Sequence, residues 1–126
     1  MDAVSANARH RIDVHHHVLP PHFVSSLNGL NIPWTGGPDV PRWSHGLARE
    51  TMEMAGIAAA VASVSPGVYW CGDTLLAVSL ARSCNEFLAE LVRDDPHHFG
   101  GFATGGALNV QADIEDADRV GQGADG

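Results

Sequence analysis

The sequence contains no lysine, and this absence limits the classes of molecule that the protein is expected to bind. All seven basic residues are arginine, while 15 carboxylates leave a formal net charge of −8. A nucleic acid needs a basic face against its phosphates, and an anionic membrane surface attracts basic clusters. The composition therefore predicts neither a nucleic-acid partner nor a membrane partner. A small anionic substrate is still compatible with it, because a few arginines or a metal ion can hold one.

Cysteines and long apolar runs are also scarce. The two cysteines, Cys71 and Cys84, form no CxxC pair and are too few for a disulfide scaffold. No apolar run approaches the roughly 20 residues that span a bilayer. The first residues lack the apolar core of a signal peptide. These absences predict a cytoplasmic protein with reduced thiols.

The order of strand-like and helix-like segments predicts the α/β class. Apolar and β-branched residues alternate or cluster where strands are expected, and apolar residues recur at helical spacing where helices are expected. Such alternation of strands and helices indicates a parallel sheet with helices packed on it. We expect strands at 11–17, 57–65 and 102–104, helices at 22–30, after a Ser44 cap, and at 74–93, a weaker helix in 109–120, a disordered lead-in at 1–10 and a disordered tail at 121–126.

Three adjacent histidines lie in the first predicted strand, RIDVHHHVLPP. Because strand side chains alternate, His15 and His17 should project from one face, with Asp13 on the same face and His16 on the other. Two imidazoles at this spacing can chelate one divalent ion, and the carboxyl ends of strands are where α/β proteins bind ligands. Two histidines that merely cap a strand are the alternative. A purification tag is disfavoured, since the run is internal and strand-like on both sides.

Other residues of reactive or metal-binding types are predicted to have structural roles. Cys84 lies on the apolar stripe of the predicted 74–93 helix and is expected in the core. His97 and His98 follow that helix, so we expect them in a surface turn at the opposite, amino-terminal end of the strands. Trp34 and Trp43 fall in a loop rich in proline and glycine, either as lid residues over a pocket or, as we expect, as anchors.

The first strand also resembles that of a known enzyme family. IDVHHHVLPPHFV is similar to the first strand of the amidohydrolase-related group of the amidohydrolase superfamily, which has an Asp, then His-x-His, then a loop ending in Pro. The likeness extends through MEMAGIAAAVASVSPG and ARSCNEFLAELVRDDPHHFGGFAT, over about residues 11–105. The group includes metal-dependent hydrolases and non-oxidative decarboxylases similar to aminocarboxymuconate-semialdehyde decarboxylase.

The resemblance implies a (β/α)8 barrel, of which residues 11–120 would be the amino-terminal portion, about three βα units. It implies that His15 and His17 hold a divalent metal, usually zinc, that Asp13 supports them, and that the substrate is a small carboxylated organic acid. The catalytic residues remain unknown, because the further ligand histidine, the catalytic histidine and a late aspartate are expected on strands beyond these.

Two functional hypotheses follow. The first is part of a metal-dependent hydrolase or decarboxylase, with decarboxylation favoured by the overall likeness and with an incomplete zinc site. The second is a non-catalytic chain that forms a homo-oligomer or docks on another subunit, because a three-stranded sheet would leave apolar faces uncovered.

Overall fold

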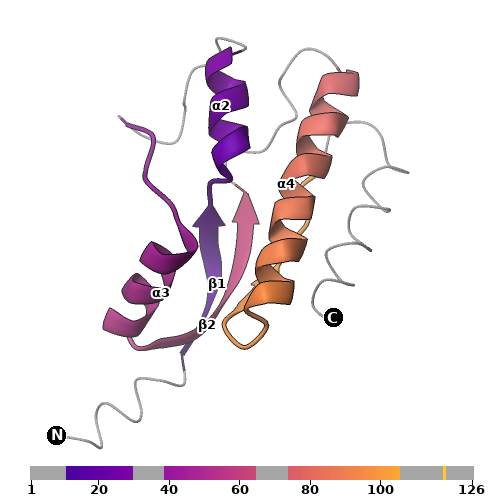
Figure 1. Ribbon diagram of the computed structural model, residues 1–126. Helices are drawn as coiled ribbons and strands as arrows, with labels where there is room; N and C mark the ends of the chain where they lie inside the picture. Colours follow the sequence, from indigo (N-terminus) through magenta and orange to yellow (C-terminus); the bar gives the residue numbers. More distant parts are fainter. Residues whose placement is uncertain (1–10, 30–38, 65–73, 106–117, 119–126) are drawn as a thin grey trace, which may run out of the picture.

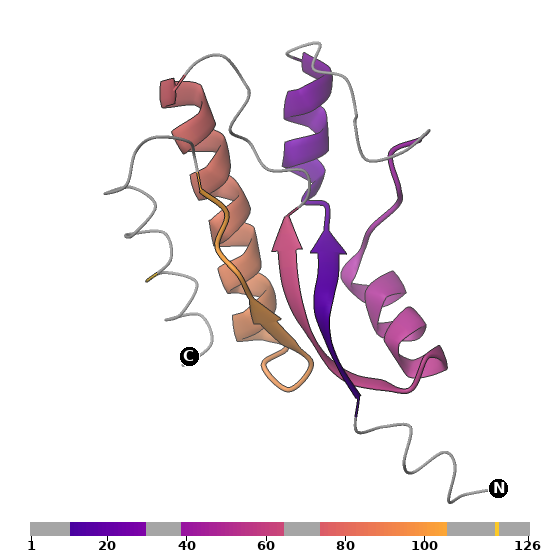
Figure 2. The ribbon, with the colours of Figure 1, turned by 180° about the vertical axis from the view of Figure 1, so that it is seen from behind.

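A computed structural model describes residues 11–29, 39–64, 74–105 and 118. They form a parallel three-stranded sheet in the order β1-β2-β3, with helices against one face and beyond its carboxyl end (Figures 1 and 2). The predicted alternation of strands and helices is therefore confirmed. The elements are β1 (Arg11–Val18), α2 (Pro21–Gly29), α3 (His45–Met54), β2 (Ile57–Val64), α4 (Thr74–Asp94) and β3 (Phe99–Gly101).

Local signals set the ends of α3. The Ser44 side chain accepts a hydrogen bond from the backbone N–H of Leu47 at 3.1 Å, which satisfies one of the unpaired donors of the first turn. At the other end Gly56 has a φ of 69°, a left-handed conformation that glycine adopts without steric cost. The helix start at Ser44 and the stop at Gly56 were both predicted from the sequence.

The core lies between the sheet and the helices. Alanines at positions 60 and 62 of β2 are buried, and their small side chains let α3 and α4 approach the strand closely. Leu88 and Cys84 of α4 are fully buried in the same cluster. Burial raises the pKa of the Cys84 thiol to about 12, so this cysteine is an inert core residue, as predicted.

The third strand lies three residues earlier than predicted. Phe99, Gly100 and Gly101 pair with β2, whereas the sequence favoured residues 102–104. The reason is burial: Phe99 is 2% exposed and contributes to the core, while Phe102 is 57% exposed. Backbone pairing to β2 compensates for the weak strand preference of the two glycines.

Some expectations concern residues outside the described ranges. These are the lead-in at 1–10, the tail at 121–126, nearly all of the weak helix at 109–120, Trp34 and Cys71. Among the helices that the structure describes, none combines the length and apolar character needed to cross a membrane.

Candidate functional site

His15 and His17 lie together near the carboxyl end of β1. Their Nε2 atoms are 3.0 Å apart, and the rings meet edge to face with centroids at 4.7 Å. Both side chains are exposed. Strand alternation explains the shared face, because the two residues are two positions apart. The structure therefore brings the predicted pair together, with the two Nε2 atoms at hydrogen-bond distance from each other.

Ser63 of β2 contacts the same pair. It lies beside His17 in the parallel ladder, and its Oγ is 3.3 Å from His17 Nδ1. If the hydroxyl accepts the Nδ1–H, the lone pair of His17 Nε2 is left free for a metal. Ser63 is a functional candidate that sequence reasoning missed, since only the register between β1 and β2 identifies it.

Asp13 is not on the face that the sequence predicted. Asp13 pairs with Ala60 and His16 pairs with Ala62, so β1 advances three residues where β2 advances two. This extra residue is a β-bulge, which breaks the alternation between Asp13 and the histidines that follow it. The expectation of a shared face is therefore wrong. Asp13 instead accepts a hydrogen bond from the backbone N–H of His15 at 2.9 Å.

His16 points away from the pair, as predicted, and packs on the face of the sheet that the helices cover. Its Nε2 accepts a hydrogen bond from Trp43 Nε1 at 3.3 Å, and its ring packs against Phe99. Burial lowers the pKa of His16, and the Asp13 carboxylate, which raises it, does not offset this. Trp43 also packs on Phe87 of α4, with ring centroids 5.6 Å apart, which confirms its predicted role as an anchor.

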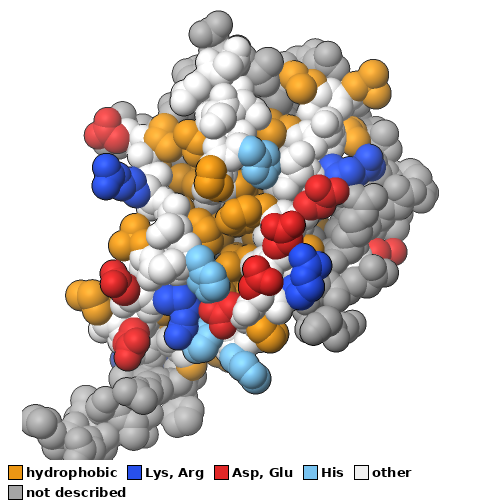
Figure 3. All heavy atoms as spheres, viewed as in Figure 1, with side chains coloured by type: hydrophobic (Ala, Val, Ile, Leu, Met, Phe, Trp, Pro, Cys, Tyr) orange, Lys and Arg blue, Asp and Glu red, His pale blue; other side chains and the backbone are white. Residues whose placement is uncertain are grey.

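A second group of polar residues lies at the opposite end of the sheet. Figure 3 shows histidine, acidic and arginine side chains gathered over α3 and the end of α4. Asp95 is at the centre: its oxygens lie 2.7 Å from His45 Nε2 and 2.6 Å from His98 Nδ1. Arg49 Nε is 3.6 Å from the same carboxylate. His97 and His98 both lie in a turn before β3, as predicted, and His98 additionally contacts Asp95.

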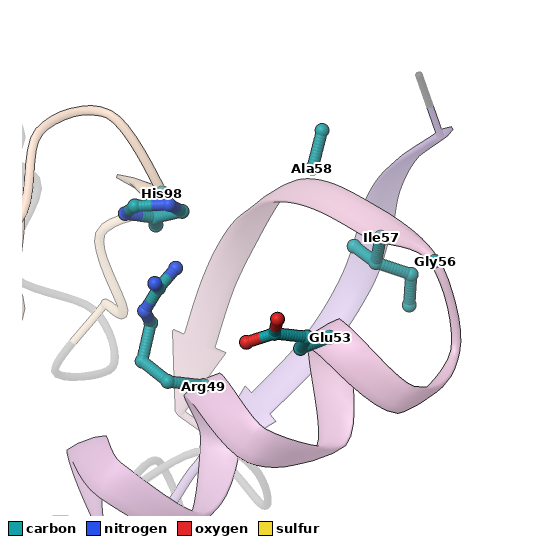
Figure 4. Close-up of a pocket in the computed structure, with 6 residues that line it drawn as sticks. All are labelled: Arg49, Glu53, Gly56, Ile57, Ala58 and His98. Carbon is teal, nitrogen blue, oxygen red and sulfur yellow. The ribbon is translucent and has the colours of Figure 1, made fainter. Parts of the chain in front are cut away.

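A hollow of about 370 Å³ opens beside this group, lined by Arg49, Glu53, Gly56, Ile57, Ala58 and His98. Figure 4 shows the Arg49 side chain reaching toward His98 and the Glu53 carboxylate turned toward Arg49. The hollow borders the start of β2, whereas His15 and His17 lie near the carboxyl end of β1. It is therefore separate from the histidine pair.

The Asp95 group makes the stability of the fold dependent on pH. Burial by itself would raise the pKa of Asp95, but hydrogen bonds with His45 and His98, together with the charge of Arg49, hold it below its usual value. A carboxyl whose pKa is lower in the folded state stabilises the fold above its unfolded pKa, about 4. That contribution is lost as the pH falls through the lower, folded value.

We expect Asp95→Asn to lower the free energy of unfolding by about 1–2 kcal/mol at neutral pH, because charge-assisted hydrogen bonds are lost. The difference from the wild type should shrink in acid, where the wild-type carboxyl is protonated as well. Urea unfolding at a series of pH values measures both. Asp94→Asn, at an exposed neighbouring carboxylate, is the control. The same pH dependence in both variants would show that the group does not stabilise the fold.

The histidine pair fits the geometry of a shared metal ion. Two imidazole nitrogens bound tetrahedrally to one zinc at about 2.0–2.1 Å would lie roughly 3.3 Å apart, close to the observed 3.0 Å. In the part of the chain that the structure describes, no group of three or more His, Cys, Asp or Glu side chains could hold a metal. His15 and His17 can thus supply two ligands, and two ligands alone bind zinc weakly.

Comparison with known proteins identifies relatives of this chain. No family model matches it. It is 33% identical over 98 residues to a 6-methylsalicylic acid decarboxylase of Penicillium expansum and to another of Aspergillus aculeatus. A decarboxylase of Aspergillus niger is 32% identical over 104 residues. Each alignment covers 75% of this chain but only 26–29% of the relative. The chain thus spans less than a third of the length of these curated relatives.

The fold also matches a solved structure. The chain aligns with the crystal structure of an amidohydrolase II with a TM-score of 0.77 at 23% identity, over 90% of this chain and 38% of that one. These likenesses fit the amidohydrolase-related group over the part of the chain that aligns. The predicted α/β class and partial-barrel architecture are confirmed.

Proposed function

We propose that this chain carries one edge of the active site of a metal-dependent decarboxylase whose substrate is a small carboxylated organic acid. The observation that supports it most directly is the 3.0 Å separation of His15 Nε2 and His17 Nε2 near the carboxyl end of β1. The decarboxylase relatives favour decarboxylation over hydrolysis. We propose zinc as the metal and the cytoplasm as the location of the protein.

The residues of the chain have distinct parts in this proposal. His15 and His17 would hold the metal through Nε2, and Ser63 would keep the proton of His17 on Nδ1. When bound, the metal supplies positive charge that polarises a carboxylate or carbonyl of the substrate. Both rings are exposed, so a substrate can reach them.

The test is a zinc titration of the metal-free chain followed by NMR of the histidine side chains. We expect the resonances of His15 and His17 to move together with saturation at one zinc per chain, while those of His22 and His97 stay in place. In a second arm, 6-methylsalicylate should tighten zinc binding, and 3-methylphenol, which lacks the carboxylate, should not. The proposal is wrong if the pair does not respond to saturating zinc.

Ser63→Ala should weaken zinc binding by roughly 10–100-fold, as is typical for the loss of a hydrogen-bond partner of a ligating histidine. The physical reason is that the His17 ring then loses the contact that fixes its tautomer. Competition with a chromophoric chelator measures the affinity. Ser25→Ala on α2, an exposed serine whose hydroxyl bonds only its own helix in the described contacts, is the matched control. Equal affinities for the two variants would contradict the role of Ser63.

The second candidate function is assembly with another copy of the chain through the face of the sheet that carries Ile12 and Val14. Ile12 and Val14 of β1 are 64% and 67% exposed, which is unusual for apolar residues of a central β/α sheet. Burying them against a second copy would remove apolar surface from water. Sedimentation equilibrium should then show a dimer that Ile12→Lys converts to a monomer. A wild-type chain that sediments as a monomer at high concentration rules this candidate out.

A further inference from the structure

The bulge in β1 determines which face of the sheet carries the side chains of His15 and His17. Between the pairs Asp13↔Ala60 and His16↔Ala62, β1 contains one residue more than β2. Asp13 and His16 pair with the buried Ala60 and Ala62 and lie on the face packed by helices, whereas His15 and His17 are exposed on the other face. A regular strand would instead put Asp13 on the same face as the histidine pair. The arrangement of the pair therefore depends on what holds the bulge.

The Asp13 carboxylate stabilises the bulge directly. Its Oδ1 accepts the backbone N–H of His15 at 2.9 Å, a side-chain bond to the backbone two residues further along. Bulged residues lose ladder hydrogen bonds, so a partner for this N–H compensates for the irregularity. Asp13 thus acts on the main chain of His15 and not on its ring.

His16 and Trp43 connect Asp13 to the helices. His16 Nδ1 lies 3.8 Å from Asp13 Oδ2, and the His16 side chain is only 14% exposed. The Trp43 indole can only donate, so His16 Nε2 accepts and a neutral His16 ring carries its proton on Nδ1, the nitrogen that contacts the Asp13 carboxylate without a hydrogen bond. Trp43 in turn packs on Phe87 of α4. The contacts run from the bulge, along the face packed by helices, to α4.

We propose that Asp13, His16 and Trp43 form a tether that holds the β1 bulge and thereby sets the relative position of the His15 and His17 rings. These three are positioning residues: none of them touches the region between the two Nε2 atoms. The tether itself does not depend on the proposed metal function. Only its consequence, tighter binding of a metal by His15 and His17, rests on that proposal. The geometry of the rings is a property of the metal-free chain.

The experiment compares Asp13→Ala with Asp13→Asn in the full chain. In the metal-free protein, Asp13→Ala should weaken the nuclear Overhauser effect between the two rings and speed hydrogen exchange at the His15 amide. Asp13→Asn keeps an oxygen acceptor for that amide and should retain both signals. For zinc affinity we expect a loss of roughly 10–100-fold in the alanine variant and near-normal binding in the asparagine variant. Glu50→Gln, at an exposed carboxylate of α3, is the control.

Trp43→Phe provides an independent test, because it keeps an aromatic ring against Phe87 but removes the N–H bonded to His16. It should also weaken the signal between the rings. The proposal is overturned if both Asp13→Ala and Trp43→Phe leave the ring contact and the His15 amide unchanged, or if Asp13→Asn behaves like Asp13→Ala. If the wild type binds no zinc but the ring contact still depends on Asp13, the proposed function fails and the tether stands.

Discussion

Replacing His15 and His17 with alanine is expected to remove zinc binding at this site. Zinc sites with four ligands contribute about 10–16 kcal/mol, so each ligand supplies roughly 3 kcal/mol. Each single replacement should therefore weaken binding by roughly 100-fold, and the double replacement should reduce it to nonspecific levels. Isothermal titration calorimetry on the metal-free chain measures these affinities, and metal analysis after gel filtration measures the zinc retained.

The control is a protein that lacks two histidines elsewhere. His22 on α2 and His97 after α4 are both exposed, and neither lies in β1. The variant His22→Ala/His97→Ala should therefore bind zinc as the wild type does. Equal zinc retention in the two double variants would show that the 3.0 Å approach of the rings in β1 is not a metal site. If only one of His15 and His17 matters, the two rings do not act as a chelating pair.

The elements that sequence reasoning located correctly are those set by local interactions. Ser44 begins α3 because its own side chain caps the first turn, and Gly56 ends the helix because of its own backbone conformation. The apolar stripe of α4, with Cys84 and Leu88 at its centre, follows from helical spacing alone. Interactions within a few residues suffice for these predictions.

The errors come from contacts between strands. Alternation places His15 and His17 together correctly, because the irregularity lies on the Asp13 side of the pair. It misplaces Asp13, because the bulge lies between Asp13 and His16 and depends on how β1 pairs with β2. The same dependence hides Ser63, which meets His17 only through the register. Pairing of strands distant in sequence is not encoded in the spacing of any one segment.

A buried amide is a further feature that periodicity does not reveal. Asn85 follows Cys84 in α4 and is fully buried. Its Nδ2 donates to the carbonyl oxygen of Thr104 at 2.9 Å, and its Oδ1 accepts the Thr104 N–H at 2.8 Å. One side chain thus pairs with both backbone groups of a residue just after β3. This contact holds the segment leaving the sheet against α4.

Asn85→Ala is expected to lower the free energy of unfolding by about 3 kcal/mol, because two hydrogen bonds worth about 0.5–1.5 kcal/mol each are lost and a cavity is left at a fully buried position. In a domain of this size that is a decrease in Tm of roughly 10–20 °C. Asn85→Leu restores most of the side-chain volume but neither hydrogen bond, so it separates packing from pairing. Urea unfolding of both variants gives the free energies.

Ser83→Ala is the matched control, since the Ser83 hydroxyl donates to the carbonyl of Ser79 within the same helix. We expect a change of no more than about 0.5 kcal/mol there. If Asn85→Leu is as stable as the wild type, the paired bonds to Thr104 contribute nothing and the prediction is wrong. If both Asn85 variants lose about 3 kcal/mol while Ser83→Ala does not, the stability of the β3 exit depends on hydrogen bonding. Hydrophobic packing of α4 would then be insufficient by itself to hold that segment to the sheet.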